Sequence, residues 1–553
     1  MKILLIVPNY NDKKFYRMPI GIMYISSYLK KKGYDVSCLN LNHYGPSKLG
    51  EVLQECCFDV VATGGLFTHI RYIRSVVEIT RKHNPMAKIV LGGAIASGDP
   101  EFIMDELKPD FLVIGEGEIS MDNLLKAINN NSDLQNVKGI AFKKKGHLVK
   151  TESTPVIEDL DQIPCPDYEG FEYEYYLDNY NLQEQFFAAI KDSDKRRMGF
   201  IVSTRDCIAK CTFCFRIMGG DFRNRSLENL FGEIKYLVER YKINELELMD
   251  DMFAASKDRV LKFCETVKPM NLLWRCQVRV NMVDEDILKV MKEAGCYLIS
   301  YGFESGSRDV LKSMKKGITP NLIEKAIRAT IKAKITIQAN FIFGDPAETI
   351  ETMQETINFG RKFKSTNIGC RMIAPYPGTV LYKDLKENGM INNLVGFYEN
   401  PNELMNMTSL SKKEFLYLCR KVDFENNYRR RFAFAEIIES KKITQQLYEL
   451  SVSCPHCGKR NKQIRVNFNL GTMIVCEHCY QRFFINMAEF RFGNISQIYQ
   501  YYYLSLKRII LYNAGVHRLL FPLPNIIEKM AALSRTMVNL IMSGSNLLFH
   551  QRK

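Results

Sequence analysis

Three closely spaced cysteines are the residues of this sequence with the clearest chemistry. Cys207, Cys211 and Cys214 stand in the segment CIAKCTFC, directly after an apolar segment that predicts a strand. Three thiolates on one short loop can ligate a cubane [4Fe–4S] cluster, and three ligands for four irons leave one iron open to a small molecule. A partial zinc site and three packing cysteines are the alternative interpretations. We expect the three cysteines to ligate a [4Fe–4S] cluster.

Four further cysteines form a second set near the C-terminus. They stand as CPHCG and CEHCY, with 18 residues between the two pairs. Two such knuckles can present four thiolates tetrahedrally, which predicts a zinc-ribbon-like module; a rubredoxin-like single iron is the alternative, because the same knuckles hold either metal. His456 and His478 lie inside the loops, and we do not expect them to be ligands. The four cysteines are Cys454, Cys457, Cys476 and Cys479.

The elements before the cysteine triplet predict a doubly wound α/β domain over residues 1–148. Short, fully apolar segments such as KILLIVP, DVVATGG and KIVLGG alternate with amphipathic ones, which is typical of a parallel sheet covered on both faces. Glycines close several of these strands, where a ligand can approach the backbone; ordinary turn glycines are the alternative. The glycines of interest are Gly92, Gly93, Gly115 and Gly117.

A polar, proline-containing linker is predicted over residues 149–197, and a second strand–helix alternation over 198–385. Six such units indicate most of a β/α barrel, with its reactive groups at the C-terminal ends of the strands. No histidine lies between Leu148 and His456, so the barrel has no imidazole base of its own. We expect a helical extension over 386–450, the four-cysteine module over 451–488 and a basic helical tail over 489–553.

Composition limits the classes of protein that remain. Apolar residues make up 46% and charged residues 25%, as in a folded chain. Sixteen cysteines without a recognisable leader favour a cytoplasmic protein, and no uncharged apolar run is long enough to span a bilayer. Half of the net charge of +14 lies after residue 490. Such a tail favours peripheral contact with an acidic membrane surface, with nucleic acid as a weaker option.

The cysteine triplet and its barrel resemble the radical S-adenosylmethionine (SAM) superfamily, whose motif is CxxxCxxC with an aromatic before the last cysteine, here Phe213. The resemblance implies that SAM binds the open iron and is cleaved to a 5′-deoxyadenosyl radical, with Phe213 near the adenine. Asp250 and Asp251 in MDDMF would accept the methionine amine, and Glu304 in GFESG would bind the ribose. FIFGDPAET and PYPGT resemble later strand motifs of the cobalamin-binding branch.

The N-terminal domain resembles the cobalamin-binding domain of the same branch. The resemblance rests on GGAIASGDPE and IGEGEISMDNLL, and it implies cobalamin contacts at Gly92, Gly93, Gly115, Glu116 and Gly117. The histidine motif DxHxxG of many cobalamin proteins is absent, so a domain without cofactor is the alternative.

The resemblance implies an enzyme, and methylation of an unreactive carbon is the leading hypothesis: one SAM methylates cobalamin and a second yields the radical. A radical cyclase or rearrangement enzyme without methyl transfer is the first alternative. A lipid-surface or nucleic-acid binding protein acting through the C-terminal module and tail is the second. The expected partners are a small-molecule or lipid substrate and an electron donor such as flavodoxin or ferredoxin.

Overall fold

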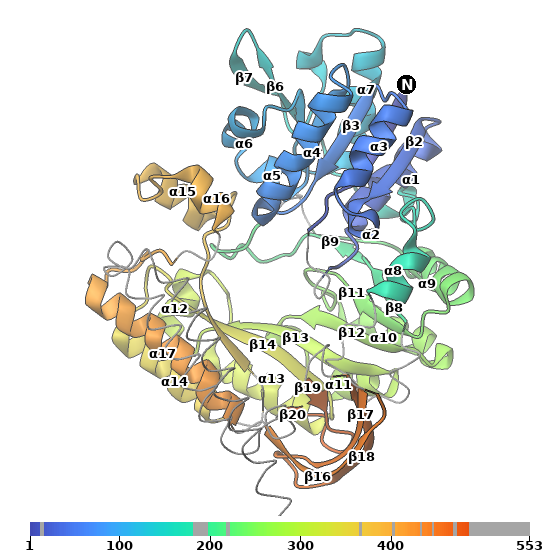
Figure 1. Cartoon of the computed structure of the whole chain (residues 1–553). Coiled ribbons are helices and arrows are strands. Elements are labelled where there is room, and N and C mark those ends of the chain that lie inside the picture. The colour runs from blue at the N-terminus through green and yellow to red at the C-terminus, as the bar shows by residue number, and fades with distance from the viewer. Residues whose placement is uncertain are drawn as a thin grey trace, which may run out of the picture. The chain divides into compact units, whose positions relative to one another are not determined.

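The computed structural model describes most of the chain up to Ile485 (Figure 1). The described residues are 1–10, 16–180, 197–216, 222–363, 366, 368–400, 404–431, 434–444, 447–467 and 473–485. They belong to one compact unit, Met1–Ile485. The predicted basic tail, 489–553, lies outside the described residues.

A seven-stranded sheet forms the N-terminal domain, in the order β2-β1-β3-β4-β5-β6-β7. Strands β1 to β5 are parallel, whereas β6 and β7 extend the sheet as an antiparallel hairpin. The sequence analysis did not predict this hairpin. The strands are β1 (Lys2–Val7), β2 (Asp35–Asn40), β3 (Val60–Gly64), β4 (Lys88–Gly92), β5 (Phe111–Val113), β6 (Ile140–Lys144) and β7 (His147–Lys150).

Alternate residues of the central strand β1 pack against helices on opposite faces of this sheet. Ile3 and Leu5 share a core with residues of α1 (Ile20–Lys31) and α7 (Gly117–Asn129), whereas Leu4 and Ile6 pack with residues of α3 (Ser47–Glu55) and α4 (Ile70–His83). Because successive side chains of a strand point to opposite faces, a strand covered on both sides must be apolar throughout. The domain is therefore doubly wound, as predicted.

The second domain is built on a six-stranded parallel sheet in the order β15-β14-β13-β12-β11-β8, with helices between successive strands. This arrangement confirms the predicted partial β/α barrel. The strands are β8 (Met198–Ile201), β11 (Glu245–Leu248), β12 (Leu273–Val278), β13 (Cys296–Glu304), β14 (Thr336–Phe343) and β15 (Ile368–Met372). The helices are α9 (Leu227–Tyr241), α10 (Lys257–Val267), α11 (Glu285–Glu293), α12 (Arg308–Ser313), α13 (Pro320–Lys332) and α14 (Ile350–Arg361).

The edge strand β15 is covered by α17 (Lys412–Arg431). The side-chain amide of Asn426 donates to the carbonyl of Cys370 at 2.5 Å, and its oxygen accepts from the Cys370 N–H at 2.7 Å. The neighbouring Glu425 forms an ion pair with Arg361 of α14. The helix therefore bonds to the strand edge as well as packing on it.

The predicted helical extension over 386–450 is wrong in its second half. Helices α15 (Val380–Glu387), α16 (Leu394–Glu399) and α17 occupy the first part, but β16 (Phe434–Lys442) and β17 (Leu447–Ser453) follow. They join β18 (Arg460–Asn467), β19 (Met473–Val475) and β20 (Arg482–Ile485) in a sheet of order β18-β17-β16-β20-β19. Leu450 and Val452 alternate with polar residues and are buried in this sheet. The module is thus larger than predicted, because its knuckles rest on strands that precede them.

None of the helices in the described part of the chain is long and apolar enough to span a membrane.

Candidate functional site

The cysteine triplet lies on an irregular loop that follows β8 and the short strand β9 (Thr204–Arg205). Cys211 is buried, Cys207 is half-buried and Cys214 is exposed. The Thr212 N–H donates to the carbonyl of Met314 at 3.2 Å, and its own carbonyl accepts from the Leu381 N–H at 3.4 Å. The loop is therefore held by the segments that follow β13 and β15, at the C-terminal end of the barrel.

Several charged groups act on the thiol of Cys214. Although Cys214 is exposed as a residue, desolvation of its thiol by the surrounding protein raises the pKa of Cys214 to about 11; Cys211, Asp251 and Cys207 raise it further, and Lys316 opposes them. The three cysteines thus share one electrostatic neighbourhood with a carboxylate and an ammonium group. Three soft thiolates beside a cation are a donor set that fits an iron–sulfur cluster.

Phe213, Lys316 and Glu304 form a linked group beside the triplet. Phe213 packs with Val310 and Met314, and the Lys316 ammonium lies 5.8 Å from the centre of its ring. Lys316 also donates to a Glu304 carboxylate oxygen at 2.8 Å. Glu304 ends β13 with a positive φ of 61°, a conformation that non-glycine residues keep only where the surroundings require it. The structure brings two predicted SAM contacts together around a lysine that the sequence analysis missed.

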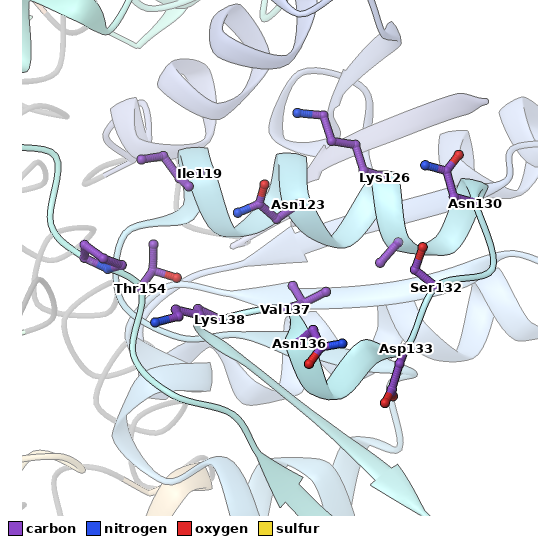
Figure 2. A pocket seen from close by; sticks show the side chains of 12 residues that line it. Ile119, Asn123, Lys126, Asn130, Ser132, Asp133, Asn136, Val137, Lys138 and Thr154 are labelled. Atoms are coloured by element: carbon purple, nitrogen blue, oxygen red, sulfur yellow. The ribbon is translucent and has the colours of Figure 1, made fainter.

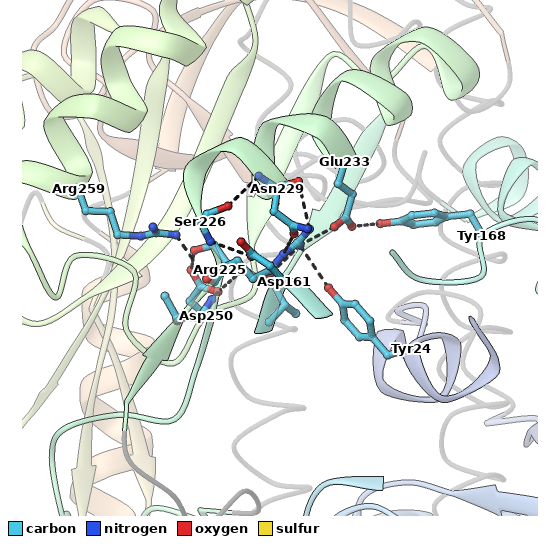
Figure 3. Close-up of polar contacts among 12 residues, drawn as sticks. Tyr24, Asp161, Tyr168, Arg225, Ser226, Asn229, Glu233, Asp250 and Arg259 are labelled. Atoms are coloured by element: carbon cyan, nitrogen blue, oxygen red, sulfur yellow. Dashed lines mark hydrogen bonds and ion pairs between the residues drawn. The ribbon is translucent and has the colours of Figure 1, made fainter. Parts of the chain in front are cut away.

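The two predicted aspartates, Asp250 and Asp251, have different surroundings in the structure. Asp250 is buried, and its carboxylate accepts from the N–H groups of Ser203 and Thr204 at 2.6 and 2.9 Å and from the Ser203 hydroxyl (Figure 3). Burial raises its pKa to about 6, although these hydrogen bonds oppose the shift. Its Oδ1 holds the backbone after β8 and its Oδ2 holds the Ser203 side chain, so Asp250 is a positioning residue of the loop. Asp251 is exposed and acts on the thiol of Cys214, and its role as an acceptor stays a prediction.

A buried ion pair fixes the start of the barrel to the linker and to α1. Arg225 donates to Glu233 of α9 at 2.5 Å, and the Tyr168 hydroxyl donates to the other oxygen of Glu233 at 2.5 Å. Arg225 also approaches the hydroxyl of Tyr24 at 3.5 Å (Figure 3). Sequence reasoning missed this network because its members are far apart in the chain and belong to no motif.

Glycines at the ends of β3 and β4 bring two backbone segments close together. A Cβ on Gly64 would clash with the carbonyl of Gly92, and a Cβ on Gly93 would lie 3.2 Å from backbone atoms of Gly65. Gly93 also has a φ of 79°, which favours glycine. A Cβ on Gly92 would meet no atom within 4 Å. The two strand ends therefore pack backbone to backbone, and the open space at Gly92 is where a ligand could approach them.

The turn after β5 differs from its predicted role. Gly115 has a φ of 79° and donates its N–H to Ser97 at 3.0 Å, so it needs to be glycine for the turn. A Cβ on Gly117 would lie 2.7 Å from Ile25, which makes this glycine a packing residue between α7 and α1. Neither observation points to a ligand at this turn, whereas the open space at Gly92 is consistent with the predicted approach of one.

Glu116 was predicted to contact a cofactor, but its carboxylate is engaged in a buried ion-pair network. It accepts from Arg205 at 3.0 Å, from Arg223 at 3.1 Å and from the Ile157 N–H at 2.9 Å. Although burial alone would raise its pKa, Arg223 and Arg205 hold the pKa below its usual value. Arg205 also pairs with Glu118 at 2.5 Å. Because Arg205 immediately precedes the cysteine loop, this network ties the N-terminal domain to the loop.

A second tie connects the N-terminal domain with the segment after β15. Asp99 accepts from the Tyr382 hydroxyl at 2.5 Å and from the Lys386 ammonium at 2.7 Å. A Cβ on Gly98 would lie 2.7 Å from the Pro377 carbonyl, so the PYPGT segment touches α5 (Ala94–Gly98) at a glycine. The N-terminal domain is thus bonded to the segment after β8, the first strand of the barrel, and to the segment after β15, its last strand.

A hollow beside α7 is a different kind of feature (Figure 2). Its lining includes Asn123, Lys126, Asn136 and Lys138, and it contains neither cysteine nor histidine. It lies on the outer side of α7 and not at the strand ends, so it is not part of the site described above.

Comparison with protein families assigns both domains. Residues 201–360 match the model of the radical SAM superfamily, and residues 14–125 match the model of the B12 binding domain. The chain therefore combines a radical SAM domain with a B12-binding domain. The cysteine loop at 207–214 lies inside the first match, and the glycine-lined ends of β3 and β4 lie inside the second.

Relatives of this radical SAM enzyme have more than one activity. An uncharacterized methyltransferase of Pyrococcus horikoshii is 26% identical over 457 residues, which cover 79% of this chain and 95% of that protein. An anaerobic magnesium-protoporphyrin IX monomethyl ester cyclase of Cereibacter sphaeroides is 28% identical over 448 residues, covering 78% of this chain and 70% of the cyclase.

Solved structures show the same fold. The radical SAM methyltransferase TsrM of Kitasatospora setae, in a structure with cobalamin and a [4Fe–4S] cluster bound, has a TM-score of 0.58 and 18% identity. The match covers 70% of this chain and 75% of TsrM. The similarity includes both domains, because it exceeds the length of either domain alone.

Proposed function

We propose that this radical SAM enzyme is a cobalamin-dependent methyltransferase that acts on an unreactive carbon. The observation that carries the proposal is the connection between the two domains: Glu116, Arg205 and Arg223 bond the B12-binding domain directly to the loop of the cysteine triplet. Methyl transfer to a substrate radical needs a methyl carrier and a radical source at a fixed separation. Two buried ties between the domains meet this requirement.

The proposed cofactors are a [4Fe–4S] cluster on Cys207, Cys211 and Cys214, SAM, cobalamin, and one Zn²⁺ in the four-cysteine module. When bound, the cluster supplies the electron that cleaves SAM, and cobalamin supplies the methyl carrier. Because reduction of the cluster requires an electron from a reductant, we propose an external donor such as a flavodoxin or ferredoxin.

Residues around the cluster loop would orient SAM. Phe213 offers an aromatic face for the adenine, and the Glu304 carboxylate, held by Lys316, offers an acceptor for ribose hydroxyls. Asp251, exposed beside Cys214, is the carboxylate that can accept from the methionine ammonium, because Asp250 is already used by Ser203 and Thr204. Hydrogen-atom abstraction requires no imidazole base, which is consistent with a barrel that lacks histidine.

Methyl transfer can be tested before the substrate is identified. The full chain is reconstituted anaerobically with iron, sulfide and cobalamin, reduced, and given SAM with a labelled methyl group together with an extract of small molecules and lipids. The proposal predicts 5′-deoxyadenosine, S-adenosylhomocysteine and a labelled product. Formation of 5′-deoxyadenosine and a modified product that carries no label would contradict methyl transfer.

A radical cyclase or rearrangement enzyme is the second candidate, and the cyclase relative of Cereibacter sphaeroides specifically favours it. The same experiment separates the two: a cyclase forms 5′-deoxyadenosine with an unlabelled product and no S-adenosylhomocysteine.

A further inference from the structure

The four-cysteine module consists of two knuckles with matching hydrogen bonds. In the first, the Gly458 N–H donates to the Cys454 carbonyl at 2.9 Å; in the second, the Tyr480 N–H donates to the Cys476 carbonyl at 2.9 Å. The N–H groups two residues after Cys454 and Cys476 each donate to the sulfur of that cysteine at 3.4 Å. Two equivalent knuckles therefore present their sulfurs in the same way.

The sulfurs of Cys454, Cys457, Cys476 and Cys479 all lie within 4.8 Å of one another, a separation at which one ion can contact all four. His456 is excluded as a ligand because its Nε2 lies 2.7 Å from the Arg482 carbonyl of the opposite knuckle. His478 is excluded in the same way, at 3.0 Å from the Arg460 carbonyl. Four thiolates with no open position are typical of a structural Zn²⁺ site.

The second knuckle contacts the barrel at the beginnings of its strands. The carbonyl of Tyr480 accepts from the hydroxyl of Thr336, the first residue of β14, at 2.7 Å. The guanidinium of Arg482 donates to the carbonyl of Ile337, the next residue, at 2.8 Å. The ammonium of Lys292 in α11 lies 3.4 Å from the centre of the Tyr480 ring.

Apolar contacts extend the same interface. Val475, which directly precedes the ligand Cys476, is buried with Tyr297 and Leu298 near the start of β13, and Leu273 at the start of β12 packs beside them. All these positions are at the N-terminal ends of the strands, whereas the cysteine triplet follows the C-terminal end of β8. The module therefore lies at the end of the barrel opposite the reaction site.

The contact residues are continuous with the metal ligands. Tyr480 follows Cys479 directly and has a φ of 57°, a conformation fixed by the knuckle turn. A metal that closes the knuckle also fixes the Tyr480 carbonyl and ring against Thr336 and Lys292. Loss of the metal would free the knuckle, and these contacts would be lost with it.

We propose that the four cysteines bind one Zn²⁺ as a brace for the barrel, so that metal occupancy in the module stabilises the N-terminal ends of β12, β13 and β14. The inference rests on the proposed zinc and is independent of the proposed methyl transfer. It assigns the module no electron transfer, because Zn²⁺ has no redox chemistry, and no substrate binding, because four ligands leave no open position.

The metal is tested first, in the full chain. A variant with Cys207, Cys211 and Cys214 all changed to Ala removes the ligands of the iron–sulfur cluster, and elemental analysis should then find one zinc per chain and negligible iron. Adding Cys476→Ser should remove the zinc, whereas the matched control Cys57→Ser, at an exposed cysteine outside both sets, should retain it. One iron per chain in the triple variant, or zinc retained in the Cys476→Ser variant, would overturn the zinc site.

The brace is tested with the chain's single tryptophan. Trp274 is fully buried in β12, one residue from the interface residue Leu273, so its fluorescence reports on this end of the barrel. Removing zinc with a chelator should lower the midpoint of thermal unfolding at Trp274 by on the order of 5 °C, and added Zn²⁺ should restore it.

A variant of two barrel residues distinguishes zinc binding from the stabilisation of the barrel by zinc. Thr336→Val with Lys292→Ala removes two contacts to Tyr480 and leaves every ligand in place. It should keep one zinc per chain, and the chelator-induced shift of the Trp274 midpoint should fall by at least half. A bound zinc whose removal leaves the Trp274 midpoint unchanged in the unmodified chain would overturn the brace while leaving the metal site intact.

Discussion

Replacement of Asp250 by Asn tests whether Asp250 positions the cysteine loop, as the structure indicates, or binds SAM, as the sequence predicts. The Asp250 carboxylate is fully buried, and its pKa of about 6 lies well above the ordinary value of 3.8. Because the folded pKa is raised, the group favours the folded state at low pH, and this contribution is lost as pH rises from 4 through 6. At pH 8 the ionised carboxylate costs about 3 kcal/mol.

Asparagine removes this charge and can preserve the hydrogen bonds. Its oxygen can accept from the N–H groups of Ser203 and Thr204, and its amide can donate to the Ser203 hydroxyl. We expect Asp250→Asn to raise the unfolding midpoint at pH 8 by several degrees and to leave it nearly unchanged at pH 4. Asp250→Ala leaves two buried N–H groups without an acceptor, at about 1–3 kcal/mol each, and should lower the midpoint.

The assay combines thermal unfolding, followed at Trp274, with SAM binding and 5′-deoxyadenosine formation. A positioning role predicts that Asp250→Asn binds SAM and forms 5′-deoxyadenosine within about threefold of the unmodified enzyme. If the folded Asp250→Asn variant instead loses more than tenfold in SAM affinity, while Asp251→Asn does not, the methionine ammonium binds Asp250 and our reasoning is refuted.

Three further predictions concern other parts of the site. Cys211→Ala should abolish 5′-deoxyadenosine formation and cluster absorbance, and a variant that still forms it would show that the cluster lies elsewhere. Glu116→Gln should reduce the free energy of unfolding by about 2–3 kcal/mol, because two buried guanidinium groups each lose one carboxylate partner, which leaves Arg205 with Glu118 and Arg223 with Asp206; urea denaturation measures this, and an unchanged midpoint would show that the tie is not needed. Glu304→Gln should raise the Kd for SAM about tenfold, measured by calorimetry on the folded variant; an unchanged Kd would exclude the ribose contact.

Much of the fold could be predicted from local sequence patterns. Buried parallel strands must be apolar on both faces, so segments such as KILLIV in β1 and KIVLG in β4 can be recognised as strands from their composition. The cysteine triplet and the two knuckles could be found for a similar reason, because their ligand spacing is local. The strands β16 and β17 were missed because their stability comes from pairing with β18 and β20, which lie later in the chain.

Two predicted site residues have protein partners that the sequence did not indicate, because those partners are distant in the chain. Glu116 and Asp250 lie in motif segments that suggest a ligand contact, yet both carboxylates are satisfied by the protein itself. Their partners, such as Arg223 and Ser203, carry no signal that links them to these acids. Lys316 was missed similarly, because nothing in its local sequence indicates that it pairs with Glu304.

The bond between Asn426 and Cys370 bears on how this enzyme behaves at high concentration. An exposed strand edge offers its N–H and carbonyl groups to the strands of other molecules, which is a common route to aggregation. On β15, both backbone groups of Cys370 are already bonded to a single side-chain amide. A helix thereby performs the task of a missing neighbouring strand, and the barrel sheet ends without offering this position to a second chain.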